Sequence, residues 1–193
     1  MQRICVFCGS SFGARPAYRD AAVEVGTLLA GKGIGLVYGG SNIGLMGALA
    51  DAALSSGGEV IGVIPQALVA KEVAHRGLTE LRVVATMHER KALMAEFSDA
   101  FLALPGGYGT LEEFLEAVTW SQLGIHRKPC GVLNVAGYYD SLLAFFDKAV
   151  EERFFRPENR ALVLADSRAE ILIDRLLSYQ LPLAGKWLGP ADS

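Results

Sequence analysis

Residues 3–11 read Arg-Ile-Cys-Val-Phe-Cys-Gly-Ser-Ser, a short apolar run that ends in a glycine and two serines. A run of this length and composition, closed by turn residues, predicts a buried β-strand. The next segment, Ala17–Leu29, places its apolar residues on one helical face, and Gly35–Tyr38 is a second short apolar run. Strand, helix and strand in this order predict a βαβ unit, in which the two strands are parallel.

The same alternation continues along most of the chain. A second helix is expected over Ile43–Leu54, before the pair Gly57-Gly58. Because the short runs are apolar almost throughout, we expect helices to cover the sheet on both faces. The sequence therefore predicts an α/β fold, a doubly wound parallel sheet of six or seven strands. The expected strands are Arg3–Cys8, Gly35–Tyr38, Val60–Ile64, Leu81–Val84, Ala100–Leu104, Gly131–Val135 and Ala161–Leu164.

Length and charge narrow the class of protein. The chain has 193 residues, so we expect one domain over residues 1–181, with Pro182–Ser193, rich in proline and glycine, as a mobile tail. The net charge of −3, from 18 basic and 21 acidic residues, gives no general attraction to nucleic acid or anionic membranes, so neither is expected as a partner. No apolar run approaches the roughly 18 residues of a membrane span, and the N-terminus lacks the features of a signal peptide. We therefore expect a cytoplasmic protein.

The cysteines point to packing rather than to chemistry. Three cysteines cannot all pair within one chain, which agrees with a reducing compartment. Cys5 and Cys8 form a CxxC pattern, but on a strand an odd offset directs two side chains to opposite faces. A structural role is therefore favoured over a redox or metal-binding one, since no Cys or His cluster completes a zinc site.

Three expected strand exits are rich in glycine: Cys8–Ser11, Gly39–Gly44 and Pro105–Thr110. Ligands of doubly wound sheets bind outside the carboxyl ends of the strands. Three glycine-rich turns at one edge indicate that backbone amides approach a single ligand closely, and a phosphorylated ligand suits such amides. The NAD fingerprint, the P-loop and the GxSxG elbow are each incomplete or absent.

Glu113 allows two interpretations. With a helix expected from Leu111, Thr110 and Glu113 have the spacing of a capping box, which spacing alone favours. The same carboxylate also lies beside the proposed anion site, where it could hold ribose hydroxyls or a water molecule.

Arg90 and Lys91 follow a second capping-box pattern, Thr86 and Glu89. They are expected in the early turns of a helix, where cations oppose the helix dipole. A solvated charged surface and a site for an anionic substrate are equally compatible with this placement.

Two stretches, Met87–Lys91 and Pro105–Glu113, resemble the LOG ("Lonely guy") family of phosphoribohydrolases, which are often mislabelled lysine decarboxylases. The family's PGGxGTxxE signature is present in full, and the resemblance runs from Cys5 through Asn134 into the segment after Tyr139. It implies a Rossmann-like fold, a dimer or larger assembly, and hydrolysis of the N-glycosidic bond of adenine-type nucleoside 5'-monophosphates, including cytokinin riboside monophosphates. The products would be the free base and ribose 5-phosphate. No metal or organic cofactor is implied.

The resemblance also assigns residues. It places the catalytic arginine at Arg90 and the catalytic glutamate at Glu113, and a glutamate near the base at Glu72. The expected substrate contacts are Gly9, Ser10, Asn42, Glu72, Arg90, Lys91, Gly107, Tyr108, Gly109 and Thr110.

Two other functions remain as alternatives. A nucleotide-binding sensor module would use the same glycine loops without turnover. Amino-acid decarboxylation would need a Schiff-base lysine and pyridoxal phosphate, and no lysine lies in a sequence context that suggests one.

The apolar residues in and after the helix expected from Leu111 also predict a homodimer. These residues cover more of the helix surface than one contact with the sheet needs, so part of them should be buried against a second subunit. They are Phe114, Leu115, Val118, Trp120, Leu123 and Ile125.

Overall fold

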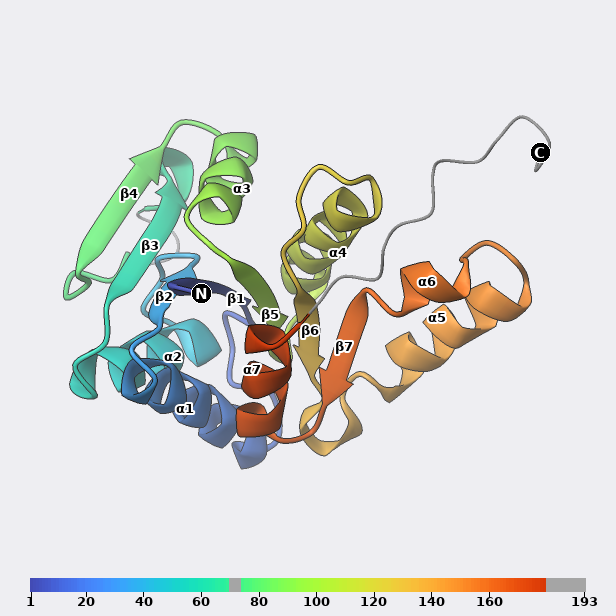
Figure 1. Ribbon diagram of the computed structural model, residues 1–193. Coiled ribbons are helices and arrows are strands. Elements are labelled where there is room, and N and C mark those ends of the chain that lie inside the picture. The colour runs from blue at the N-terminus through green and yellow to red at the C-terminus, as the bar shows by residue number, and fades with distance from the viewer. Residues whose placement is uncertain (70–73, 180–193) are drawn as a thin grey trace.

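A seven-stranded, wholly parallel sheet forms the centre of the computed structural model, which describes residues 1–69 and 74–179 (Figure 1). The strand order is β4-β3-β2-β1-β5-β6-β7. The expected doubly wound sheet is thus confirmed, with the seventh strand included. The strands are β1 (Arg3–Phe7), β2 (Gly35–Tyr38), β3 (Val60–Pro65), β4 (Glu80–Val84), β5 (Ala100–Ala103), β6 (Cys130–Leu133) and β7 (Val163–Asp166).

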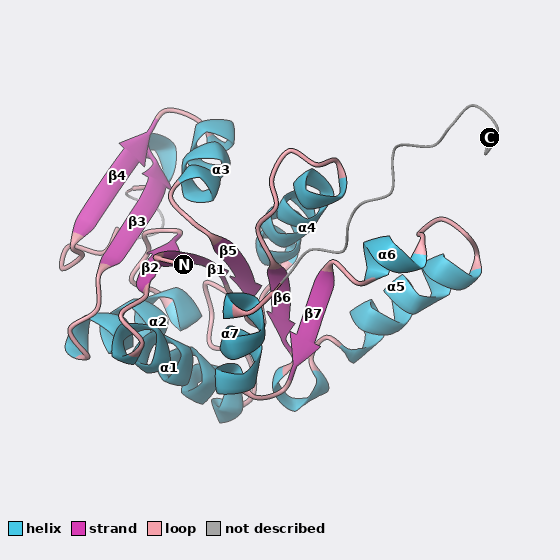
Figure 2. Ribbon diagram, viewed as in Figure 1, coloured by secondary structure: helices cyan, strands magenta, loops and turns pink. Residues whose placement is uncertain are grey.

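Helices cover both faces of this sheet (Figure 2). On one face, α1, α2 and α7 pack over Ile4, Val6 and Leu36. On the other, α3, α4 and α5 pack over Cys5, Phe7 and Phe101. The helices are α1 (Pro16–Gly31), α2 (Gly44–Ser55), α3 (Met87–Glu96), α4 (Tyr108–Gln122), α5 (Asp140–Glu151), α6 (Pro157–Arg160) and α7 (Ala169–Leu177), with short 3-10 turns η1 (Gln66–Leu68) and η2 (Val135–Gly137).

The last two strands differ most from their expected bounds. β6 ends at Leu133 because Asn134 and Val135 already lead into η2. β7 begins two residues later than expected, since Pro157–Arg160 forms a short helix whose last turn is continued by Ala161.

Cys5 and Cys8 lie on opposite faces of the sheet, as the odd spacing predicts. Both are buried free thiols, and so is Cys130. Burial raises the pKa of Cys5 and of Cys8 far above the ordinary thiol value, and raises that of Cys130 to about 12. All three thiols are therefore protonated at neutral pH, which suits packing and excludes easy nucleophilic use.

The chain changes direction across the sheet between β1 and β5. From β1 it winds outward through β2 and β3 to β4, and then returns to place β5 on the other side of β1. Such a switch point opens a crevice outside the carboxyl ends of the two central strands, where ligands of these folds bind. Gly9 and Pro105 follow these two strand ends.

Two predictions fall on residues outside the described part of the chain. Glu72 lies within residues 70–73, and the expected tail, Pro182–Ser193, lies within residues 180–193. Within residues 1–69 and 74–179, no helix is long and apolar enough to cross a membrane.

Candidate functional site

The three glycine-rich loops meet at the switch point, as their strand exits predict. The amide of Gly9 donates to the carbonyl of Pro105 at 3.0 Å, and the amide of Leu45 donates to the carbonyl of Gly9 at 3.1 Å. Gly44 adopts a left-handed φ of 59°, and a Cβ there would lie 2.3 Å from the carbonyl carbon of Ser10. Glycine is therefore required at position 44 by both conformation and space.

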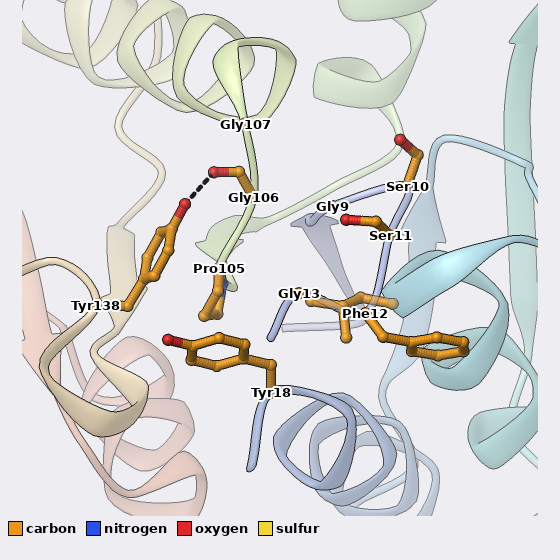
Figure 3. Close-up of a pocket in the computed structure, with 11 residues that line it drawn as sticks. Gly9, Ser10, Ser11, Phe12, Gly13, Tyr18, Pro105, Gly106, Gly107 and Tyr138 are labelled. Carbon is orange, nitrogen blue, oxygen red and sulfur yellow. Dashed lines mark hydrogen bonds between the residues drawn. The ribbon is translucent and has the colours of Figure 1, made fainter. Parts of the chain in front are cut away.

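Two cavities open beside these loops and share Gly9, Ser10 and Gly107. The first, of about 350 Å³, contains the carboxylate and the guanidinium that the sequence singles out, Glu113 and Arg90. The second, of about 320 Å³, lies toward α1 and has Tyr18 and Tyr138 in its wall (Figure 3). Both volumes suit a small-molecule ligand.

The capping box at the start of α3 fixes the position of Arg90. As predicted, Thr86 Oγ1 accepts from the amide of Glu89 at 3.1 Å, and the Glu89 carboxylate accepts from the amide of Thr86 at 3.3 Å. Arg90 lies in the first turns of α3, and its side chain lines the cavity that contains Glu113. Its side chain is only 7% exposed.

Arg90 and Glu113 form a buried ion pair. Nη2 of Arg90 lies 3.7 Å from Oε1 of Glu113, whose side chain is 13% exposed, and 3.4 Å from the carbonyl oxygen of Gly39. Nε of Arg90 has no hydrogen-bond partner within the described residues. The guanidinium is thus held between α4 and the exit of β2, with one buried donor left unsatisfied.

Helix α4 begins earlier than predicted, and the capping box expected for Thr110 and Glu113 is wrong. The helix starts at Tyr108 with Gly107 as its N-cap, and the carbonyl of Gly107 accepts from the amide of Leu111 at 3.1 Å. Thr110 is therefore a buried residue of the first turn rather than a cap. Glu113 lies one turn further on, where it faces Arg90.

The glycine positions of this loop differ in whether they have space for a side chain. A Cβ on Gly106 would lie 2.1 Å from Thr110 Oγ1, so packing alone requires glycine there. A Cβ on Gly107 or on Gly109 would meet nothing within 4 Å. Gly109 and Thr110 are in the first turn of α4, where amides have no partner within the helix. Gly107, Gly109 and Thr110 also line the cavity of Arg90, and a cavity beside such amides is what an anionic ligand requires.

The structure separates the adjacent cations Arg90 and Lys91. Nζ of Lys91 pairs with the carboxylates of Glu112 and Glu116, the latter at 3.0 Å, and so ties α3 to α4. Burial lowers the pKa of Lys91, but these hydrogen bonds outweigh it and raise the pKa above its ordinary value. Lys91 does not line either cavity.

The remaining predicted contacts lie around the cavity of Arg90. Gly9, Ser10, Gly107, Tyr108, Gly109 and Thr110 line it, and Tyr108 is almost fully exposed. Asn42 is exposed in the loop before α2 and lines neither cavity. Within residues 1–69 and 74–179, no group of three or more His, Cys, Asp or Glu side chains could hold a metal ion.

Two further residues contribute to this edge of the sheet: Gly39, which the sequence shows only as part of the glycine-rich turn Gly39–Gly44, and Tyr138, which sequence reasoning missed. Gly39 gives Arg90 its space, because a Cβ there would lie 2.2 Å from Nη2 of Arg90. The Tyr138 hydroxyl donates to the carbonyl of Gly106 in the third glycine loop. The strand-exit rule places both residues at this edge, since Gly39 follows β2 directly and Tyr138 follows β6 after a short turn, but it does not indicate what they contact.

Comparison with known proteins supports a family assignment. The family model described as "Possible lysine decarboxylase" matches residues 46–176. The cytokinin riboside 5'-monophosphate phosphoribohydrolase LOG1 of Arabidopsis thaliana is 56% identical over 178 residues, which are 92% of this chain and 84% of that protein. The probable cytokinin riboside 5'-monophosphate phosphoribohydrolase LOGL9 of Oryza sativa subsp. japonica is 57% identical over 178 residues, with 92% and 78% covered.

Solved structures share the fold at lower identity. The molybdenum cofactor carrier protein of Chlamydomonas reinhardtii superposes with a TM-score of 0.71 at 22% identity, covering 92% of this chain and 99% of that one. The molybdenum cofactor binding protein of Rippkaea orientalis gives a TM-score of 0.69 at 24% identity, with 92% and 97% covered. At these identities the likeness concerns the arrangement of strands and helices alone.

Proposed function

Because this chain belongs to the LOG family of phosphoribohydrolases, we propose that it hydrolyses the N-glycosidic bond of adenine-type nucleoside 5'-monophosphates, cytokinin riboside monophosphates among them. The products are the free base and ribose 5-phosphate. The observation that carries the proposal is the buried pair of Arg90 and Glu113, which opens into a cavity beside the start of α4.

The 5'-phosphate binds at the start of α4 in this proposal. The amides of Gly107, Gly109 and Thr110 supply donors, and the helix dipole favours a negative charge at this end. The open space in front of Gly107 and Gly109 supports this placement, since packing does not require glycine at either position. A phosphate anchored here would place the ribose near Arg90 and Glu113.

Glu113 stabilises the positive charge that develops on the ribose as the base departs. In glycoside hydrolysis a carboxylate near the anomeric carbon stabilises the oxocarbenium-like transition state or positions the attacking water. Glu113 orients the ribose hydroxyls and this water. Arg90 fixes the ribose and phosphate end and holds the Glu113 carboxylate in place, and its planar fork can contact two partners at once.

Substitution of Glu113 by glutamine tests the proposal. Glu113→Gln keeps the shape and hydrogen-bonding capacity of the side chain but removes its charge, so kcat for AMP should fall by about 100-fold or more. The release of free adenine measures this. Because Glu113 is not a cap, the start of α4 should be unaffected, and any fall in the melting temperature reports the loss of the buried pair with Arg90.

Glu116→Gln is the matched control, because Glu116 is a carboxylate of the same helix that pairs with Lys91 and lines neither cavity. Its activity should stay within a few-fold of the unmodified protein. Turnover of Glu113→Gln at the level of this control would remove Glu113 from the mechanism.

The two alternative functions make different predictions. A nucleotide sensor would bind AMP and release no adenine, so the same assay separates it from the hydrolase. A decarboxylase would need a lysine in the site. The described lysines instead contact Asp174, Glu112 and Glu116, the Ala95 carbonyl, and Glu151 and Glu152, and none lines either cavity.

A further inference from the structure

Two consecutive tyrosines, Tyr138 and Tyr139, stand behind the third glycine loop. They follow η2, a tight turn in which Ala136 and Gly137 both have left-handed φ values, 51° and 74°. The Asn134 side chain secures this turn, since its Oδ1 accepts from the amide of Tyr139 at 2.7 Å and its Nδ2 donates to Asp140 at 2.7 Å. The backbone that carries the two tyrosines is therefore held in one conformation.

Both hydroxyls donate to carbonyl oxygens at the exit of β5. Tyr139 donates to Leu104 at 2.6 Å, and Tyr138 donates to Gly106 at 2.6 Å (Figure 3). The Tyr138 ring packs edge-on against Tyr18 of α1 with centroids 5.6 Å apart, and against Tyr139 at 5.0 Å. Edge-to-face contacts of this kind hold the ring in one orientation.

The bond to Gly106 fixes the orientation of a whole peptide unit. The carbonyl of Gly106 and the amide of Gly107 belong to one planar trans peptide, so they point in opposite directions. With the carbonyl held toward Tyr138, the Gly107 N–H points away from it. Gly107 also lines the cavity of Arg90 and Glu113.

A peptide between two glycines needs such an external restraint. Neither residue has a Cβ to limit rotation about the peptide plane, and Gly106 cannot acquire one because it would collide with Thr110. We propose that Tyr138 is a positioning residue for phosphate recognition: its hydroxyl orients the Gly106–Gly107 peptide so that the Gly107 N–H is directed at the 5'-phosphate. This inference rests on the function proposed above and assigns a further residue to it.

The test is Tyr138→Phe, which removes the hydroxyl and keeps the ring contacts with Tyr18 and Tyr139. Loss of one oriented donor to an anion should weaken AMP binding by about tenfold, and kcat/KM for AMP by a similar factor. Adenosine lacks the phosphate, so its binding should be unchanged. The melting temperature should stay within about 2 °C, because the hydroxyl of Tyr138 is at the surface.

Tyr179→Phe is the matched control, because the Tyr179 hydroxyl also donates to a carbonyl, that of Ala161 at 3.3 Å, away from both cavities. Calorimetric titration with AMP and with adenosine measures binding when both variants are made in the Glu113→Gln background, in which turnover is expected to be slow. A protein that binds AMP but does not hydrolyse it would contradict the proposed function and still decide the role of Tyr138. Equal losses for AMP and adenosine, or no loss for either, would overturn the inference.

Discussion

At the scale of single residues, the site depends on where one guanidinium can lie. Arg90 reaches Glu113 by passing over the backbone of Gly39, and a Cβ on Gly39 would occupy the place of Nη2. The φ of Gly39 is not left-handed, so alanine suits the backbone there. The conflict is therefore between one methyl group and the flexible end of a long side chain.

Gly39→Ala should thus move Arg90 and leave the fold intact. A displacement of about 1 Å at a catalytic group can cost about 100-fold in rate, so kcat for AMP should fall by about that factor. Steady-state kinetics and thermal melting measure the two effects. Gly31→Ala, at a position where a Cβ meets nothing within 4 Å, is the control and should keep full activity.

At this scale, the sequence predicts which residues belong to the site better than it predicts which atoms those residues contact. Spacing alone could not distinguish Arg90 from Lys91, because the choice depends on which side of α3 meets α4 and which meets the cavity. Thr110 and Glu113 have the spacing of a capping box. The helix nevertheless starts at Tyr108, with Gly107 as its N-cap. The local sequence pattern therefore predicts that Glu113 belongs to a capping box, whereas in the folded protein it pairs with Arg90.

At the scale of elements, strand exits were the most reliable guide. Six apolar runs begin within one residue of the observed strands, because burial on both faces leaves a continuous apolar signal. The seventh, β7, is displaced because Pro157–Arg160 forms a helix. The role of Tyr138 and Tyr139 could not be predicted, since neither their hydroxyl partners nor the turn geometry of η2 is visible in a residue pattern.

The start of α4 carries a prediction about the substrate. If its amides bind the 5'-phosphate, that binding energy positions the ribose for attack, so removing the phosphate should lower turnover as well as affinity. We expect kcat/KM for adenosine to be at least about 1,000-fold below that for AMP, a loss of about 4 kcal/mol. Comparable values for the two substrates would indicate a plain nucleosidase.

Gly109→Ala provides the check at the same element. Its Cβ would enter the open space in front of the first turn, while alanine favours a helix more than glycine does. AMP turnover should fall and the melting temperature should not. A variant with unchanged AMP turnover would show that the phosphate lies elsewhere.

At the scale of the whole molecule, α4 leaves apolar surface that the described chain does not cover. Leu123 and Ile125 at its end are 42% and 65% exposed, while Phe114 is fully buried against the sheet. Part of this surface should be buried by a second copy of the chain. Light scattering should give at least twice 20.6 kDa.

Ile125→Asp is the variant for this prediction, because the residue is largely exposed and its substitution spares the core. It should shift the equilibrium toward the monomer. A monomer of the unmodified protein at micromolar concentration would contradict the prediction.

The central place of β1 also governs how the chain is made. β1 pairs with β2 through Ile4 and Leu36, but its other edge pairs with β5, beginning with Ile4 and Ala100. A ribosome adding about 5–20 residues per second needs several seconds to pass from β2 to β5. During that interval the nascent chain carries an apolar strand with one open edge, a template for aggregation. Chaperone binding to the first half of the chain is therefore most useful before β5 has emerged.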